Sequence, residues 1–156
     1  MKGTREVIDV LNQALAGELV AIQQYFMHAR IFSNRGYDVL ADRIQKQTME
    51  EMKHAETLTD RILFLEGVPE PRMQETPSIG RSVREQLQND LALEQHATKM
   101  LNDGIAVTRA KGDNGSADIL TKILADEEEH MSWLETQLAL IEKLGQSTYL
   151  LGQLRA

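Results

Sequence analysis

The chain has 156 residues, of which 42% are hydrophobic and only 4% are aromatic, and its net charge is −7. This length suits one domain over residues 1–156 with a sizeable core, and the acidic balance argues against a nucleic-acid partner. The absence of cysteine excludes disulfides, cysteine-ligated zinc and cysteine-held iron–sulfur clusters. The first residues show neither a signal-peptide core nor a membrane span, so we expect a cytoplasmic protein without a membrane partner.

Leu, Ala, Glu, Gln and Lys are abundant and β-branched runs are scarce, which favours an all-α fold. Hydrophobic residues recur at helical spacing over residues 5–33, with Thr4 as the expected N-cap, and again over residues 38–65. Residues 34–36 interrupt this spacing and predict a tight turn between the two helices. Gly67 then ends the second helix.

Residues 67–81 form the longest irregular segment and contain all three prolines of the chain. Such a segment can reach about 50 Å, whereas a helix of about 28 residues is about 42 Å long. It can therefore return along the bundle and start the third helix parallel to the second. The third and fourth helices are expected over residues 82–110 and 116–144, and a short fifth helix over residues 147–154. The predicted architecture is an antiparallel four-helix bundle (residues 5–144) with a long crossover between its second and third helices.

Two short motifs each place a carboxylate and an imidazole on one face of a helix. Glu51 precedes His54 by three residues, and Glu127 precedes His130 by three residues. Residues at this spacing share a helix face, so each pair can hold one metal ion from the same side. The two motifs therefore predict two ligand pairs on two different helices.

Single glutamates complete this pattern in the first and third helices. Glu18 and Glu94 stand in the middle of hydrophobic stripes, where a lone charge is costly to bury. A constant offset of 76 residues joins Glu18 to Glu94, Glu51 to Glu127 and His54 to His130. The chain therefore reads as two copies of one helical pair, each of which contributes ligands to a shared centre.

A single Glu-x-x-His motif is weak evidence for a metal site, because both residue types are common on helices. Two copies at one offset are stronger evidence, because four converging carboxylates would repel one another unless cations or protons neutralise them. Carboxylates with one imidazole for each ion suit iron or manganese, and the set matches that of ferritin-like di-iron proteins. The predicted ligands are bridging Glu51 and Glu127, terminal Glu18 and Glu94, and one histidine for each ion, His54 and His130.

Four other residues have both a structural and a functional interpretation. Tyr25 follows Glu18 by seven residues, so it either supports a ligand through a hydrogen bond or packs in the core. His28 and His96 lack a partner at metal-ligand spacing and are expected at the surface or at a subunit interface. Met52 lies about 100° around its helix from the metal face, so spacing alone indicates packing.

Longer stretches resemble the bacterioferritin family across essentially the whole chain. These stretches are Met1-Lys2-Gly3, Gln24-Tyr25-Phe26, Glu51-Met52-Lys53-His54-Ala55, Arg61 to Gly67, Trp133 to Leu138, and Tyr149-Leu150. The resemblance implies a hollow cage of about twenty-four subunits that oxidises Fe(II) at a di-iron centre in each subunit and stores a ferric mineral. It also implies a b-type haem held by Met52 from two subunits, and a small ferredoxin that supplies electrons for iron release.

Two regions depart from the family pattern. Lys46 and Glu50 stand where some members have the His and Asp of an accessory iron site on the inner surface. Leu151 stands in the short last helix, where a polar amide often lines a four-fold channel.

Two other functions remain open from the sequence, and so does a mixed cage with a second subunit type. A non-storing di-iron or di-manganese oxidase or peroxidase would use the same ligands together with a substrate pocket. A purely structural helical module would bind no metal at all. Native mass and iron content distinguish these alternatives.

Overall fold

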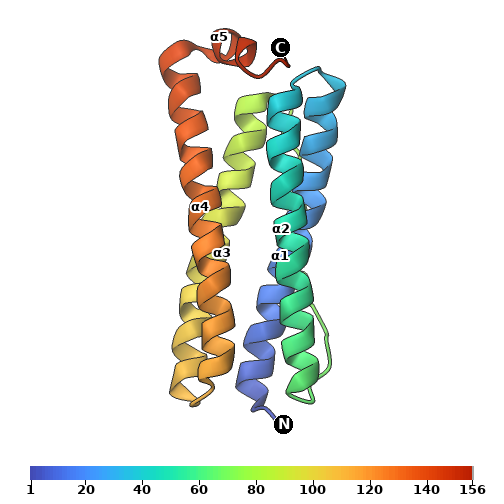
Figure 1. The fold of residues 1–156 in the computed structure, drawn as a ribbon, viewed down its shortest axis with the longest axis vertical. Coiled ribbons are helices and arrows are strands. Elements are labelled where there is room, and N and C mark those ends of the chain that lie inside the picture. Colours follow the sequence, from blue (N-terminus) through green and yellow to red (C-terminus); the bar gives the residue numbers. More distant parts are fainter. Residues whose placement is uncertain (156) are drawn as a thin grey trace.

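The computed structural model describes residues 1–155 and contains all five expected helices. They are α1 (Arg5–Asn34), α2 (Asp38–Phe64), α3 (Val83–Ala110), α4 (Asn114–Leu144) and α5 (Gln146–Leu151). Figure 1 shows the four long helices side by side, with α2 and α3 running in one direction and α1 and α4 in the other. The short α5 lies across one end of the bundle. The predicted all-α bundle with a crossover between its second and third helices is confirmed.

The helix boundaries follow the predicted ones to within one residue, with two larger differences. Thr4 caps α1 as predicted, through its side-chain oxygen. The Asp113 carboxylate accepts a hydrogen bond from the backbone N–H of Ser116 at 2.9 Å, and this cap lets α4 begin two residues earlier than expected. The prediction of a last helix over residues 147–154 is wrong in extent, because its final three residues lie beyond the end of α5.

Buried polar side chains hold the crossover segment against the bundle. His28 of α1 and Asp90 of α3 are fully buried, and the His28 ring donates through Nδ1 to Asp90 at 2.8 Å. The backbone N–H of Gly80 donates to His28 Nε2 at 3.3 Å. Gln24 adds a second connection, because it donates to Asp90 and accepts from the N–H of Ser78. The expectation that His28 lies at the surface or at a subunit interface is therefore wrong. Its partners come from α3, which is distant in sequence, and from the crossover segment.

Two hydrophobic clusters fill the bundle and leave its middle to polar residues. The first joins the end of α1 and the start of α2 to the start of α3 and the end of α4. The second joins the opposite ends of the same helices. All six predicted metal ligands fall between the two clusters along their helices. Tyr149 of α5 closes the first cluster, where its hydroxyl donates to Gln137 at 2.7 Å.

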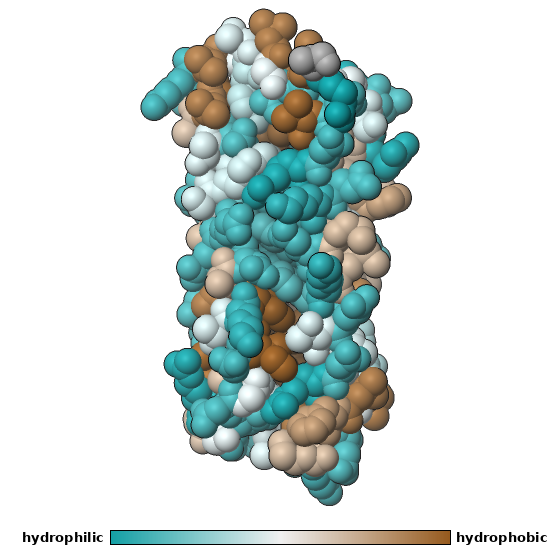
Figure 2. All heavy atoms as spheres, in the orientation of Figure 1, coloured by the Kyte–Doolittle hydropathy of each residue, from teal (hydrophilic) through white to brown (hydrophobic). Residues whose placement is uncertain are grey.

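Figure 2 shows the face on which α2 and α4 lie nearest the viewer. Hydrophilic side chains cover the middle of this face, and hydrophobic side chains lie toward its two ends. Within residues 1–155, no helix combines the length and the apolar character needed to cross a membrane.

Candidate metal centre

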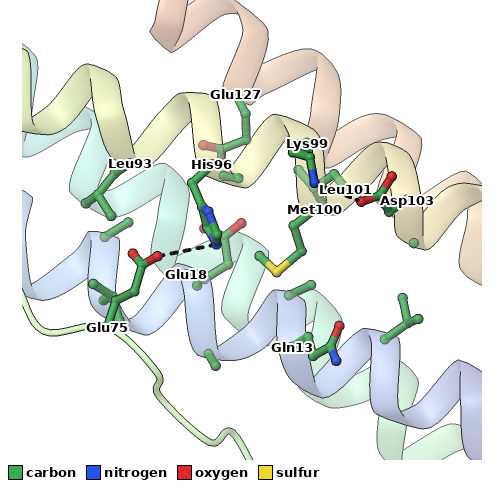
Figure 3. A pocket seen from close by; sticks show the side chains of 18 of the residues that line it. Gln13, Glu18, Glu75, Leu93, His96, Lys99, Met100, Leu101, Asp103 and Glu127 are labelled. Atoms are coloured by element: carbon green, nitrogen blue, oxygen red, sulfur yellow. Dashed lines mark ion pairs between the residues drawn. The ribbon is translucent and has the colours of Figure 1, made fainter.

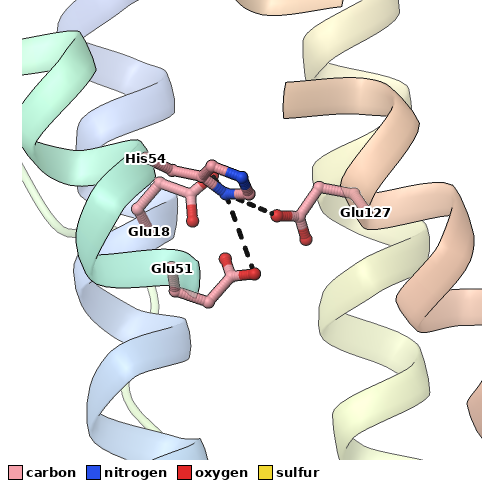
Figure 4. Close-up of side chains that lie close together, drawn as sticks. All are labelled: Glu18, Glu51, His54 and Glu127. Atoms are coloured by element: carbon pink, nitrogen blue, oxygen red, sulfur yellow. Dashed lines mark ion pairs between the residues drawn. The ribbon is translucent and has the colours of Figure 1, made fainter. Parts of the chain in front are cut away.

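The structure brings the six predicted ligands together in the middle of the bundle. Each of their residues is at most 6% exposed. The spacing of three residues within each Glu-x-x-His motif directs both side chains to the same side of the helix, as predicted. Figure 4 shows one half of the centre, in which Glu18, Glu51 and His54 face Glu127 across the bundle.

One half of the centre consists of Glu18, Glu51, His54 and Glu127. His54 Nδ1 lies 3.1 Å from Oε1 of Glu127. The same nitrogen lies 3.6 Å from Oε1 of Glu18 and 3.8 Å from Oε1 of Glu51. One ligand atom from each residue lies within 4.8 Å of all the others, so these four side chains can bind a single ion.

The other half consists of Glu51, Glu94, Glu127 and His130, and again one ligand atom from each residue lies within 4.8 Å of all the others. His130 Nδ1 lies 3.1 Å from Glu51 Oε1 and 3.5 Å from Glu94 Oε1. It lies 3.9 Å from Glu127 Oε2. Glu51 and Glu127 therefore belong to both halves, whereas each half has its own histidine and its own third glutamate.

The electrostatics of the centre favour added positive charge. Burial raises the pKa of Glu18 and of Glu127 well above the usual 4.5, and nearby glutamate charges raise it further. Burial alone would lower the pKa of His54, but the carboxylates of Glu18 and Glu51 raise it to about 11. Contacts with carboxylates likewise raise the pKa of His130 to about 10, against the effect of burial. Protons or metal ions can supply this positive charge.

The unpaired polar atoms of the centre also fit metal ions. A buried polar atom without a hydrogen bond is costly. Each predicted ligand contributes one such atom: Glu18 Oε2, Glu51 Oε1, His54 Nδ1, Glu94 Oε2, Glu127 Oε1 and His130 Nδ1. Carboxylate oxygens combined with imidazole nitrogens form a donor set suited to iron.

Two further carboxylates hold the histidine rings from outside the centre. Nε2 of His54 donates to Asp126 at 2.7 Å, and Nε2 of His130 donates to Glu50 at 2.5 Å. Because Nε2 is engaged in this way, Nδ1 is the atom left for a metal. Sequence reasoning missed this role for both carboxylates. The signal was present, because Glu50 and Asp126 are also 76 residues apart.

Tyr25 meets the centre through one ligand. Its ring is fully buried, and its hydroxyl donates a hydrogen bond to Glu94. Burial raises the pKa of Tyr25 well above the usual 10.0, and the charge of Glu94 raises it further. The hydroxyl therefore keeps its proton and can support the carboxylate, and this supporting role stays a prediction.

The proposed haem ligand and the residues that depart from the family pattern lie outside the ligand set. Met52 is 43% exposed and is absent from both ligand groups. Lys46 Nζ lies 4.0 Å from Glu50 Oε1, so the pair that replaces the accessory-site residues forms an ion pair. Leu151 is 69% exposed on α5.

Similarity to known proteins identifies the family. The family model described as a ferritin-like domain matches residues 8–144. Bacterioferritin from Mycobacterium leprae is 45% identical over 149 residues, which cover 96% of this chain and 94% of that protein. The chain belongs to the bacterioferritin family.

Further bacterioferritins agree with this membership. The Streptomyces coelicolor protein is 49% identical over 150 residues, which cover 96% of this chain and 90% of that protein. The solved structure of Mycobacterium tuberculosis bacterioferritin BfrA matches with a TM-score of 0.96 at 43% identity, over 99% of this chain and 98% of that one. The predicted ferritin-like fold is confirmed. With the buried carboxylate and histidine centre, family membership also confirms the predicted function, iron storage with ferroxidase activity.

Proposed function

We propose that the six predicted ligands bind two Fe(II) ions in each subunit and that both ions are oxidised there together. The observation that carries this proposal is the presence of Glu51 and Glu127 in both ligand groups. Shared carboxylates can bridge two ions, which then lie close enough to pass two electrons to one molecule of dioxygen or peroxide. The terminal carboxylate ligands are Glu18 and Glu94, and the histidine ligands are His54 and His130.

The residues of this bacterioferritin have separate tasks in that reaction. Glu18 and Glu127, whose pKa values are raised, release protons as the cations bind, because a metal ligand must be deprotonated. Tyr25 holds Glu94 through its hydroxyl. The carboxylates outside the centre hold the two histidine rings in the orientation that directs Nδ1 inward. The Fe(III) that results is the material stored as mineral.

Replacement of either shared glutamate tests the assignment. Glu51→Gln and Glu127→Gln each remove one bridging charge with little change in volume, so the rapid first phase of Fe(II) oxidation should be lost. Stopped-flow absorbance measures that phase, and calorimetric titration with Zn(II) counts the ions bound. Glu128→Gln changes an exposed neighbour and should leave both readouts unchanged. If Glu51→Gln binds two ions and keeps the rapid phase, the centre is assigned to the wrong residues.

We also propose that about twenty-four copies assemble into a hollow cage, as family membership suggests. The exposed Leu151 on the terminal α5 offers a contact for neighbouring subunits. Native mass spectrometry of protein with retained iron should show a particle of that size. A small oligomer would instead favour a non-storing di-iron or di-manganese oxidase, and a mixed mass distribution would show a second subunit type.

Met52 is the residue that we propose as an axial ligand of a b-type haem shared between two subunits. Its exposed position on α2 leaves the thioether accessible, and a two-fold contact would place two such sulfurs opposite each other. A small ferredoxin is the proposed electron donor for iron release, and the cytoplasm is the proposed location. Faster release of iron from haem-loaded than from haem-free cages, with a reduced ferredoxin as donor, would support this route.

A further inference from the structure

A cavity of about 410 Å³ connects the surface of the bundle with the metal centre. It is lined mainly by α1, α3 and the crossover segment, with further residues from α2 and α4. Glu75 of the crossover and His96 of α3 line it together with Glu18 and Glu94 of the centre. Figure 3 shows the His96 and Glu75 side chains pointing toward each other, with Glu18 drawn in the same cavity. Glu51 and Glu127 line it as well, so the cavity contains a surface pair and four of the proposed iron ligands.

The surface pair has the spacing of two ligands on one ion. Nε2 of His96 lies 3.4 Å from Oε1 of Glu75, and the two side chains are 60% and 45% exposed. Two atoms that each lie about 2.1 Å from one ion are about 3.4 Å apart at a tetrahedral angle and about 3.0 Å apart at a right angle. An imidazole nitrogen and a carboxylate oxygen are also the donor types found in the centre, and they suit Fe(II).

The inner part of the cavity contains acceptors for the same ion. Oε2 of Glu18 and Oε2 of Glu94 are buried without a hydrogen-bond partner, and both residues line the cavity. Small residues such as Gly17 and Ala97 form part of the wall. Neither residue has a side-chain ligand that would retain an ion on its way inward, and the terminal methyl group of Met100 lies against Gly17.

We propose that His96 and Glu75 form a loading site, which binds Fe(II) where the cavity opens and passes it inward to Glu18 and Glu94. The proposal rests on the di-iron ligands assigned above and adds a third metal site to each subunit. With two protein ligands, this site binds more weakly than the centre, which offers four to each ion. The ion therefore moves inward, and no electron is transferred at the loading site.

Crystals of the metal-free cage soaked in Zn(II) test the site without any redox reaction. Anomalous scattering should locate zinc in the centre and also between His96 and Glu75. The second peak should disappear in His96→Gln and persist in the Glu51→Gln variant. If zinc fills the centre but never appears at His96, at any Zn(II) concentration, the proposal of a loading site is overturned. The proposed function is unaffected by that result. Zinc at His96 with an empty centre overturns the di-iron assignment and, with it, the inward transfer.

The rate of Fe(II) uptake gives a second, independent readout. Under limiting Fe(II), His96→Gln and Glu75→Gln should slow the second-order uptake about tenfold, because the local concentration of the cation falls. The number of ions bound at saturation should stay at two per subunit in the centre. Glu70→Gln changes an exposed residue of the same crossover segment and serves as the matched control. Uptake by both variants at the rate of the Glu70→Gln control would overturn the proposal.

Discussion

The hydrogen bonds to Asp126 and Glu50 predict unequal losses of metal affinity when their charges are removed. Asp126→Asn and Glu50→Gln preserve shape and leave each histidine with a weaker acceptor. Loss of such a partner typically weakens metal binding about 10–100-fold, which corresponds to about 1.4–2.8 kcal/mol. The Asp126 side chain is 53% exposed, whereas that of Glu50 is 35% exposed, so water screens the charge of Asp126 more strongly.

The contact distances point the same way as the exposure. The Glu50 contact with His130 is 2.5 Å long, and the Asp126 contact with His54 is 2.7 Å long. We therefore expect a loss of about tenfold for Asp126→Asn and a loss near the upper end, about 100-fold, for Glu50→Gln. Each variant should weaken mainly one of the two ions, because each carboxylate holds a different histidine.

Competition between the metal-free protein and a chromophoric chelator for Co(II) measures both affinities. The titration should separate into a tight step and a weakened step in each variant. Two exposed residues supply matched control variants. Asp118→Asn changes a side chain that is 70% exposed on the same helix as Asp126, and Glu56→Gln changes an exposed glutamate on α2, the helix of Glu50. Affinities within twofold of these controls would refute the orienting role. A larger loss for Asp126→Asn than for Glu50→Gln would refute the argument from screening.

Three further predictions concern haem, metal and the cap of α4. Met52→Leu keeps volume and hydrophobicity, so it should preserve the cage while abolishing haem absorption, and an unchanged spectrum would contradict the axial assignment. Zn(II) should raise the melting temperature of the metal-free protein, because cations remove repulsion among buried carboxylates; no rise at saturation would contradict this. Asp113→Asn should cost about 1–2 kcal/mol at pH 7, because it removes the charge that lies 2.7 Å from Arg61, whereas asparagine can still cap α4. Burial raises the pKa of Asp113, but Ser116 and Arg61 lower it overall, below the usual 3.8. Its stabilisation is therefore complete above pH 3.8 and is lost as the pH falls through the lowered value. Denaturant titrations should show a smaller difference in free energy of unfolding between parent and variant at about pH 3 than at pH 7. An equal difference at both pH values would exclude the charge as its cause.

The six proposed ligands could be predicted from the sequence because their placement depends on local geometry. A separation of three residues in a helix places Glu51 and His54 on the same face, independently of how the rest of the chain folds. The offset of 76 residues then indicates that the second motif meets the first, because two similar helical pairs present similar faces. The same offset applies to the outer carboxylates, which the hydrophobic pattern concealed because they lie on the polar side of their helices.

The buried pair of His28 and Asp90 could not be predicted in this way. Its members are 62 residues apart and belong to no repeat. Their contact depends on how the crossover packs, since the N–H of Gly80 supplies the second hydrogen bond of the His28 ring. A lone histidine in a helix has no local feature that distinguishes burial from exposure. His96 shows the contrast, because it lies at the surface as expected and meets Glu75 only through the course of the crossover.

The position of the centre between two hydrophobic clusters explains how this bacterioferritin can tolerate a charged core. The buried carboxylates repel one another, and the raised pKa values of Glu18 and Glu127 indicate that protons offset this repulsion when cations do not. Fully buried residues on both sides, such as Leu11 and Ile62 in one cluster and Leu40 and Ile141 in the other, hold the four helices independently of the metal. Each such side chain contributes about 1.5–3 kcal/mol by burial. The destabilising groups are therefore confined to a short central section, so the subunit can stay folded while iron passes through it.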